Sequence, residues 1–174
     1  LGLACDSRVT DAAKQAMDEY GFGSTGSALT TGITQLHEDL CQYLAQMYGK
    51  EKVLLFNSGY NANIGAINGL IGPQDLVVAD VLAHASIQDA MQMCRGTTRF
   101  FKHNSVEHLE KLLKEHRQNH AGALIITEGI FSMDGDIPPL GEIASIARKY
   151  NARLFVDEAH SFGVIGKTGL GAVE

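Results

Sequence analysis

Apolar positions along the chain fall into two patterns, helical spacing and short unbroken runs. Recurrence every three or four residues predicts helices over residues 11–20, 36–48, 61–70, 84–93, 105–115 and 138–150. Unbroken apolar runs predict buried strands over residues 53–56, 76–79, 98–101, 121–127 and 153–156. Apolar strands separated by helices of about ten residues or more indicate an α/β fold. We expect a mostly parallel central sheet with helices on both faces.

Polar clusters follow several of the expected strands. In an open parallel sheet, ligands bind beyond the carboxyl ends of the strands. The clusters at those ends are Asn57 to Tyr60, Glu128 with Ser132, and Asp157 with His160. We therefore expect one ligand site along this edge of the sheet.

The stretch VDEAHSFGVIGKTG, residues 156–169, contains fragments of nucleotide-hydrolysing motifs. A phosphate-binding loop has the pattern G-x-x-x-x-G-K-[ST], so that backbone N–H groups wrap the phosphates before the lysine reaches them. The position of its first glycine is occupied by Ser161, and Lys167 follows Asp157 instead of preceding it. The chain has no other G-K-[ST] sequence. The sequence therefore argues against an ATPase.

Composition narrows the class of protein. The chain has 174 residues, 45% hydrophobic and 20% charged, as in globular domains. A net charge of −6 disfavours a broad nucleic-acid surface, and no apolar run approaches the ~20 residues of a membrane span. Cys5, Cys41 and Cys94 form no C-x-x-C pair, which predicts buried free thiols in a reducing cytoplasm and no metal site. The chain starts at Leu1 and stops at Glu174 in a Gly-rich loop, so we expect a piece of a longer protein.

The strand-end clusters suit a ligand with one phosphate and one ring nitrogen. Ser58, Gly59 and Tyr60 lie at a short strand-to-helix turn, where N–H groups and the positive helix end suit a single phosphate. Asp157 follows an apolar strand and is expected to be buried, and a buried carboxylate needs a cationic partner. None is adjacent in sequence, so a protonated pyridine nitrogen would serve. Pyridoxal phosphate carries both groups.

Three segments resemble the α-oxoamine synthase family of fold-type I pyridoxal-phosphate enzymes. They are TEGIFSMDGDIPPL (residues 127–140), VDEAHSFGVIGKTG (156–169) and LAHASIQDA (82–90). The resemblance runs from the Gly-rich loop at Gly21 to Gly171. It implies an incomplete large domain of an aminotransferase-like enzyme. Residues 1–50 would be an N-terminal segment with the Gly-rich loop, and residues 51–174 part of the cofactor-binding domain.

The resemblance implies catalytic roles for three residues. Asp157 would pair with the pyridine nitrogen and make the ring an electron sink. His84 would stack on the ring near the reacting carbon, and His160 would reach the phenolic oxygen of the ring. Each has an ordinary structural alternative. His84 could be a helix cap or a solvated side chain, and Asp157 could cap the loop that follows it.

The resemblance also implies a wider set of cofactor contacts. The turn at residues 58–60 would hold the phosphate, Ser132 would reach the phenolic oxygen, and Glu128 would brace the surroundings of the ring. Ser132 and Glu128 could instead satisfy the backbone of a turn. The expected cofactor-binding residues are Ser58, Gly59, Tyr60, His84, Glu128, Ser132, Asp157 and His160.

The chain departs from the family pattern in its Gly-rich loop, and the family's lysine is missing. Members generally carry an arginine where this chain has Ala28, so this position is not expected to anchor an acidic acyl chain or coenzyme A phosphates. The lysine that family members join to the cofactor lies beyond Glu174, and Lys167 is too close to Asp157 to be that residue. We therefore expect the 174-residue chain alone to be inactive.

The activity that the resemblance implies is a condensation. The full-length protein would join a small amino acid to an acyl-CoA or acyl-carrier thioester with loss of carbon dioxide, and so form an α-amino ketone. It would act as a cytoplasmic homodimer. Two alternatives stay open: a non-catalytic partner subunit of such a synthase, and another fold-type I activity such as aminotransfer.

Overall fold

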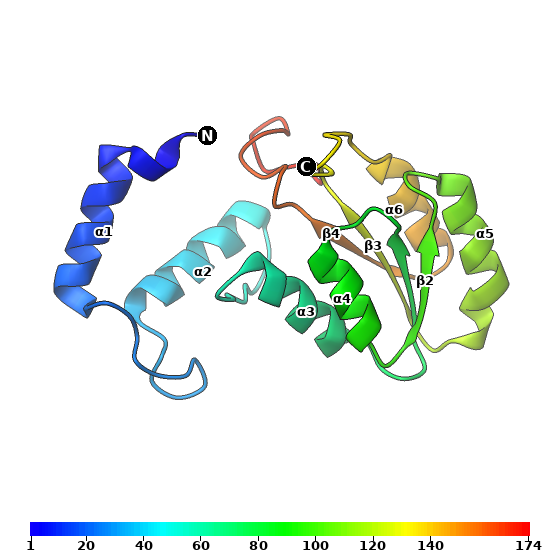
Figure 1. The fold of residues 1–174 in the computed structure, drawn as a ribbon, viewed down its shortest axis with the longest axis horizontal. Helices are drawn as coiled ribbons and strands as arrows, with labels where there is room; N and C mark the ends of the chain where they lie inside the picture. Colours follow the sequence, from blue (N-terminus) through cyan, green and yellow to red (C-terminus); the bar gives the residue numbers. More distant parts are fainter. The chain divides into compact units, whose positions relative to one another are not determined.

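A computed structural model describes all 174 residues, and its contacts divide the chain into two units (Figure 1). The units are Leu1–Leu55 and Phe56–Glu174. The domain boundary predicted after residue 50 stays a prediction. None of the helices is both long and apolar enough to cross a membrane.

The first unit consists of helices with exposed or half-buried side chains. They are η1 (Leu3–Cys5), α1 (Ser7–Tyr20) and α2 (Gln35–Tyr48). The Asp6 side chain caps α1 by accepting a hydrogen bond from Arg8 N at 2.9 Å. Gly49 ends α2 in the left-handed conformation, at φ 59°, which glycine adopts without steric cost. No residue of these helices is buried.

The strand predicted over residues 53–56 is wrong. This segment is irregular and pairs with no strand, and the Leu54 side chain is 82% exposed. An apolar run has the composition of a strand, but a strand forms only where a neighbouring backbone accepts and donates its hydrogen bonds. Whether such a segment forms a strand depends on a pairing partner and not on its composition.

The second unit is a four-stranded parallel sheet with helices on both faces, and its order is β2-β1-β3-β4. The predicted α/β fold is therefore confirmed. The central strands β1 and β3 are buried along their whole length. The elements are α3 (Gly59–Leu70), β1 (Leu76–Asp80), α4 (Ala85–Met93), β2 (Thr97–Phe101), α5 (Val106–His116), η2 (Arg117–Asn119), β3 (Ala123–Glu128), α6 (Leu140–Lys149) and β4 (Arg153–Asp157).

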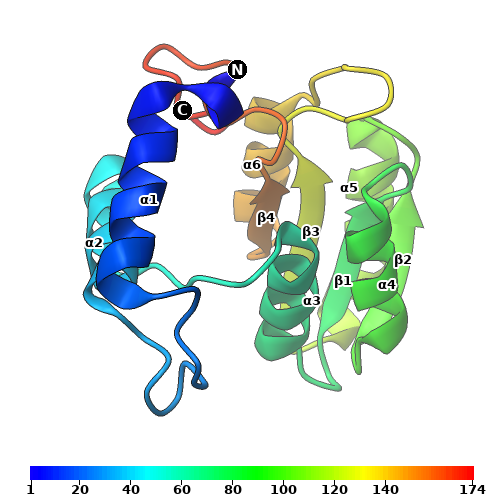
Figure 2. The same cartoon turned by 60° about the vertical axis from the view of Figure 1, so that its left-hand side comes forward.

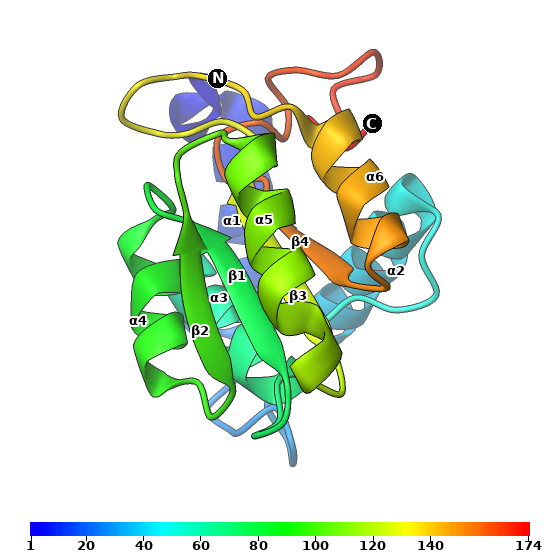
Figure 3. The ribbon, with the colours of Figure 1, turned by 90° about the vertical axis from the view of Figure 1, so that its right-hand side faces the viewer.

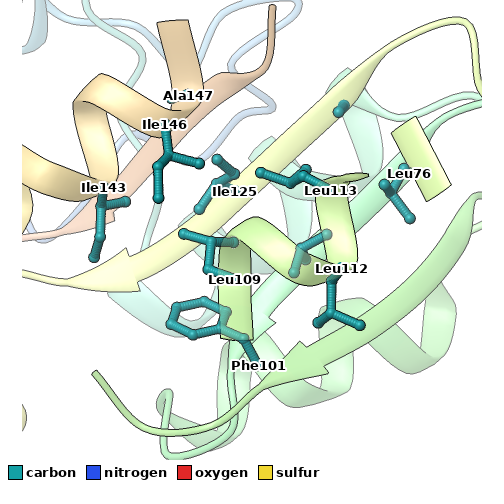
Figure 4. Close-up of a cluster of buried hydrophobic side chains, with 11 residues drawn as sticks. Leu76, Phe101, Leu109, Leu112, Leu113, Ile125, Ile143, Ile146 and Ala147 are labelled. Carbon is teal, nitrogen blue, oxygen red and sulfur yellow. The ribbon is translucent and has the colours of Figure 1, made fainter. Parts of the chain in front are cut away.

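Alternate residues of each strand belong to two separate hydrophobic cores, because successive side chains point to opposite faces of a sheet. Leu76 and Val78 of β1 pack with α5 and α6, and Val77 and Ala79 pack with α3 and α4. Figure 3 shows α5 and α6 over one face, with α3 and α4 over the other. Figure 4 shows the core on the α5–α6 side. A polar residue's position along its strand therefore decides which of the two faces it joins.

The three cysteines are free, and none is fully buried. Cys5 is exposed, while Cys41 and Cys94 are half-buried. The prediction of buried thiols is therefore wrong. Cys5 and Cys41 belong to the helices of the first unit, which bury no side chain, and Cys94 lies just after the last turn of α4.

Candidate functional site

A cavity of about 390 Å³ lies where β3 and β4 end and where α3 and α4 begin. Figure 2 shows that the loops following these two strands leave from the same end of the sheet. Of the expected cofactor-binding residues, the lining includes all except Ser58 and Ser132. Those in the lining are Gly59, Tyr60, His84, Glu128, Asp157 and His160.

Asp157 ends β4 at the floor of the cavity and has no ion-pair partner in the chain. Its Oδ1 accepts a hydrogen bond from Ala159 N at 2.9 Å, and its Oδ2 accepts one from Asn63 Nδ2 at 2.7 Å. The side chain is half-buried, so the expectation of a buried carboxylate is wrong. It stays half-exposed because β4 is an edge strand and the cavity opens beside it.

Glu128 is the cross-strand neighbour of Asp157 and belongs to the same face of the sheet. It is only 4% exposed, and its Oε1 accepts a hydrogen bond from His84 N at 2.6 Å. Burial raises the pKa of the Glu128 carboxyl above its ordinary value. The hydrogen bond from His84 lowers this pKa, while the nearby charge of Asp157 raises it. Glu128 thus anchors the backbone that carries His84.

A continuous chain of hydrogen bonds joins Asp157 to His84 through residues of α3 and α4. Asn63 Nδ2 donates both to Asp157 and to Ser86 Oγ, the latter at 2.9 Å. Ser86 Oγ lies 2.7 Å from His84 Nδ1, which also accepts from Ser86 N at 3.2 Å. With Nδ1 accepting, a neutral His84 ring carries its proton on Nε2. The chain fixes the orientation of two predicted catalytic side chains at once.

Asn63 and Ser86 are both buried and were not among the residues expected from the sequence. Asn63 lies four residues before Ile67 on the buried face of α3, so it is a polar residue at a core position. A buried amide needs hydrogen-bond partners, and that requirement is the signal that could have identified it.

The turn before α3 presents the positive end of the helix to the cavity. Ser58 caps α3 by accepting a hydrogen bond from Asn61 N at 3.1 Å, and it does not line the cavity. Gly59 and Tyr60 follow at the cavity wall. The Tyr60 hydroxyl donates to Asp89 of α4, and its ring meets His84 edge-on with centroids 6.3 Å apart. The N–H groups of Gly59 and Tyr60 suit an anionic group here.

Ser132 and His160 differ in where the structure places them. Ser132 is exposed in the loop between β3 and α6 and is not part of the cavity lining. His160 is exposed and lies at the cavity wall, three residues after Asp157. The roles predicted for both residues stay predictions.

A second cavity, of about 370 Å³, lies at the opposite edge of the sheet and holds none of the expected residues. Its cationic side chains include Arg117, whose guanidinium donates to the backbone oxygens of Tyr150, His120 and Asn151. These donors are used within the fold, so we place the candidate site at the carboxyl edge.

Comparison with known proteins gives consistent likenesses. A model of the family described as aminotransferase class I and II matches residues 2–173. The chain is 43% identical over 174 residues to the 8-amino-7-oxononanoate synthase of Treponema denticola, covering all of this chain and 44% of that protein.

Solved structures extend these likenesses to three dimensions. A serine palmitoyltransferase from S. paucimobilis with bound PLP has a TM-score of 0.96 and 39% identity, over 99% of this chain and 43% of that one. The 8-amino-7-oxononanoate synthase of Francisella tularensis has a TM-score of 0.79 and 32% identity, over 98% of this chain and 46% of that one. The chain spans less than half the length of these relatives. The predicted resemblance to α-oxoamine synthases and the predicted fold are confirmed.

Proposed function

This chain belongs to the aminotransferase class I and II family, and from that membership we propose that the full-length protein is a pyridoxal-phosphate-dependent acyltransferase. It condenses a small amino acid with an acyl-CoA or acyl-carrier thioester, releases carbon dioxide and forms an α-amino ketone. The observation that carries the proposal is the Asp157 carboxylate, which has no ion pair and lines the same cavity as the first residues of α3.

The donor set at the cavity fits pyridoxal phosphate. The ring nitrogen needs an anion, and Asp157 supplies a carboxylate whose other hydrogen bonds are to neutral donors. The phosphate needs N–H donors and a positive helix end, which α3 supplies at Gly59 and Tyr60. A volume of about 390 Å³ lies within the range of small-molecule sites.

Several residues at the cavity have a defined part in this proposal. Pyridoxal phosphate, when bound, supplies the electron sink that stabilises negative charge at the amino-acid Cα. Asp157 would hold a negative charge for the ring nitrogen, and Asn63 keeps that carboxylate oriented. Glu128 holds the backbone of His84, so the imidazole stays at the cavity wall. His160 and Ser132 are proposed to reach the phenolic oxygen.

The same side chains disfavour a non-catalytic partner subunit, and the sequence motifs disfavour an aminotransferase. A non-catalytic partner subunit would be expected to lose cofactor contacts, but Asp157, His84 and Glu128 form a connected set here. Aminotransfer is less favoured, because the motifs of this chain resemble the synthases more closely. We further propose a cytoplasmic homodimer as the working form, and we expect the 174-residue chain alone to be inactive.

The proposed function predicts where the cofactor is joined to the full-length protein. Borohydride reduction of the protein purified with pyridoxal phosphate, followed by peptide mapping, is expected to place the label on a lysine beyond Glu174. Carbon dioxide release that requires both an amino acid and an acyl thioester would establish the condensation. A label on Lys167 would refute the assignment, while amino-acid conversion without the thioester would indicate aminotransfer.

The phosphate turn predicts a selective effect of Gly59→Ala. A Cβ at Gly59 would meet no protein atom within 4 Å, so the free energy of unfolding should be unchanged or slightly higher. Gly59 lines the cavity, so an added methyl group would take up space at the proposed phosphate site, and the affinity for pyridoxal phosphate should fall roughly tenfold or more. Gly69→Ala, at the other end of α3 and also in open space, is the matched control. Equal affinities in the two variants would remove Gly59 from the phosphate site.

A further inference from the structure

A second cluster of titratable side chains lies at the same edge of the sheet, on the α5–α6 side. His103 Nδ1 lies 3.0 Å from Asp80 Oδ1, and His103 Nε2 lies 2.7 Å from Asp136 Oδ2. Asn104 N donates to Asp80 Oδ2 at 2.9 Å, and Asn104 Nδ2 donates to Asp136 Oδ2 at 2.5 Å. We call these four residues the His103 clamp. None of them lines the candidate site.

The geometry sets the number of protons on the ring. An ionised carboxylate only accepts hydrogen bonds, so an imidazole between two carboxylates must donate from both nitrogens. His103 is therefore an imidazolium when both contacts are made. Asp80 is 0% exposed, and loss of the imidazolium proton would leave its buried charge without a counter-charge. The edge of Phe131 packs on the ring, with centroids 4.5 Å apart.

The clamp joins two segments that lead to the candidate site. Asp80 ends β1, and its Oδ1 also accepts from Leu82 N at 2.9 Å, two residues before His84. Asp136 belongs to the loop 129–139, which starts directly after Glu128. That loop is folded on itself by hydrogen bonds between Phe131 and residues 135 and 136. Through His103, the clamp links Asp136 of the loop to Asp80 of the sheet by side-chain hydrogen bonds.

We propose that His103 is a positioning residue that holds the loop 129–139 against the ends of β1 and β2 only while its imidazole is protonated. Loss of the proton removes one of the two donated hydrogen bonds, and the fully buried Asp80 keeps the other. The Asp136 side chain is then held by Asn104 Nδ2 alone, and the loop opens at Asp136. The opened loop no longer holds the backbone beside Glu128 in place.

The charged groups that act on His103 are Asp80 from β1 and Asp136 from the loop. From α5, the His108 ring accepts from Lys102 N and so faces the backbone, and Glu107 lies in the first turn. Burial lowers the pKa of His103, but the hydrogen bonds and charges of the two carboxylates outweigh burial and raise the pKa above its ordinary value.

The sign of the pH dependence follows from this raised pKa. Closure is fully favoured at pH values below the ordinary pKa of an imidazole, where both states are protonated. Between that value and the higher pKa of the closed state, opening releases a proton, so closure weakens by about tenfold per pH unit. Above the higher pKa the dependence levels off.

Hydrogen exchange of the full-length protein, read by mass spectrometry, tests the clamp without reference to activity. The protection of residues 129–139, corrected for intrinsic exchange, is measured from about pH 6 to about pH 9. We expect protection to fall as the pH rises from the ordinary pKa of an imidazole to the higher pKa of His103 in the closed state. In Asp136→Asn the amide can donate to a neutral ring, so this pH dependence should disappear. His120→Gln is the control, because His120 hydrogen-bonds to the His116 carbonyl oxygen outside the clamp.

If a variant does not fold, the pKa of the His103 ring can still be measured by NMR in the unmutated protein. A pKa at or below that of a free imidazole, a flat protection profile, or an Asp136→Asn profile as steep as that of the unmutated protein would overturn the clamp. The effect of the clamp on the cofactor rests on the proposed function. If that function is right, affinity for pyridoxal phosphate should weaken over the same pH range in which His103 loses its proton. Absence of binding at every pH would refute the proposed function and leave the exchange result to judge the clamp.

Discussion

Asp157→Asn in the full-length protein is expected to lower kcat by on the order of a hundredfold, as for loss of one preorganised electrostatic partner. The amide is nearly isosteric but neutral, so the cavity loses the charge that we propose for pairing with the ring nitrogen. The loss should appear in kcat and not in KM for the amino acid, because the carboxylate acts most strongly as charge develops in the transition state.

The structure adds a stability cost to this variant. Asp157 accepts from both Asn63 Nδ2 and Ala159 N, and an asparagine has only one acceptor oxygen. We expect the free energy of unfolding to fall by about 1 kcal/mol. Asp75→Asn is a matched control at the opposite edge, where Asp75 Oδ2 accepts from Gly72 N at 2.8 Å.

Steady-state kinetics and thermal unfolding of the two variants separate the effects. Asp75→Asn keeps an acceptor oxygen for the single hydrogen bond from Gly72 N, so it should retain both stability and kcat. If Asp157→Asn also retains kcat, the carboxylate only caps the loop after β4, and its pairing with the ring nitrogen must be withdrawn.

Asn63→Ala is expected to lower both stability and kcat, although Asn63 carries no charge. Asn63 is 6% exposed and its amide donates to Asp157 and Ser86, so truncation removes a buried donor from both partners at a cost of about 1–3 kcal/mol. The orientation of the Asp157 carboxylate and of the His84 ring also loses its support. Misplacement of such groups should reduce kcat by about tenfold to a hundredfold.

Asn68→Ala provides the comparison, because Asn68 lies on the same helix and donates to the backbone oxygens of Ile64 and Ala90. It should lose stability without a comparable change in kcat. Stability is measured by denaturant unfolding and kcat by product formation with a saturating thioester. Equal losses of kcat in the two variants would mean that Asn63 only stabilises α3.

Several features of this protein follow from the sequence alone. The apolar runs of β1 and β3 predict strands buried on both faces, and the spacing between them predicts the covering helices. The polar residues Glu128 and Asp157 end their strands, so the common edge of a parallel sheet brings them together whatever the details of packing. Local pattern is sufficient here because strand direction and helix position are both set by short segments.

Other features depend on partners that are distant along the chain. Residues 53–56 have a strand's composition but no strand to pair with. Asn63 bonds to Asp157 across 94 positions, and His103 meets Asp136 across 33, so no local pattern marks either contact. Ser132 lies within a segment that resembles the family, but it is exposed in its loop and does not line the cavity. Tertiary structure decided these features, because a hydrogen bond requires a donor and an acceptor about 3 Å apart, and only the folded sheet sets that distance.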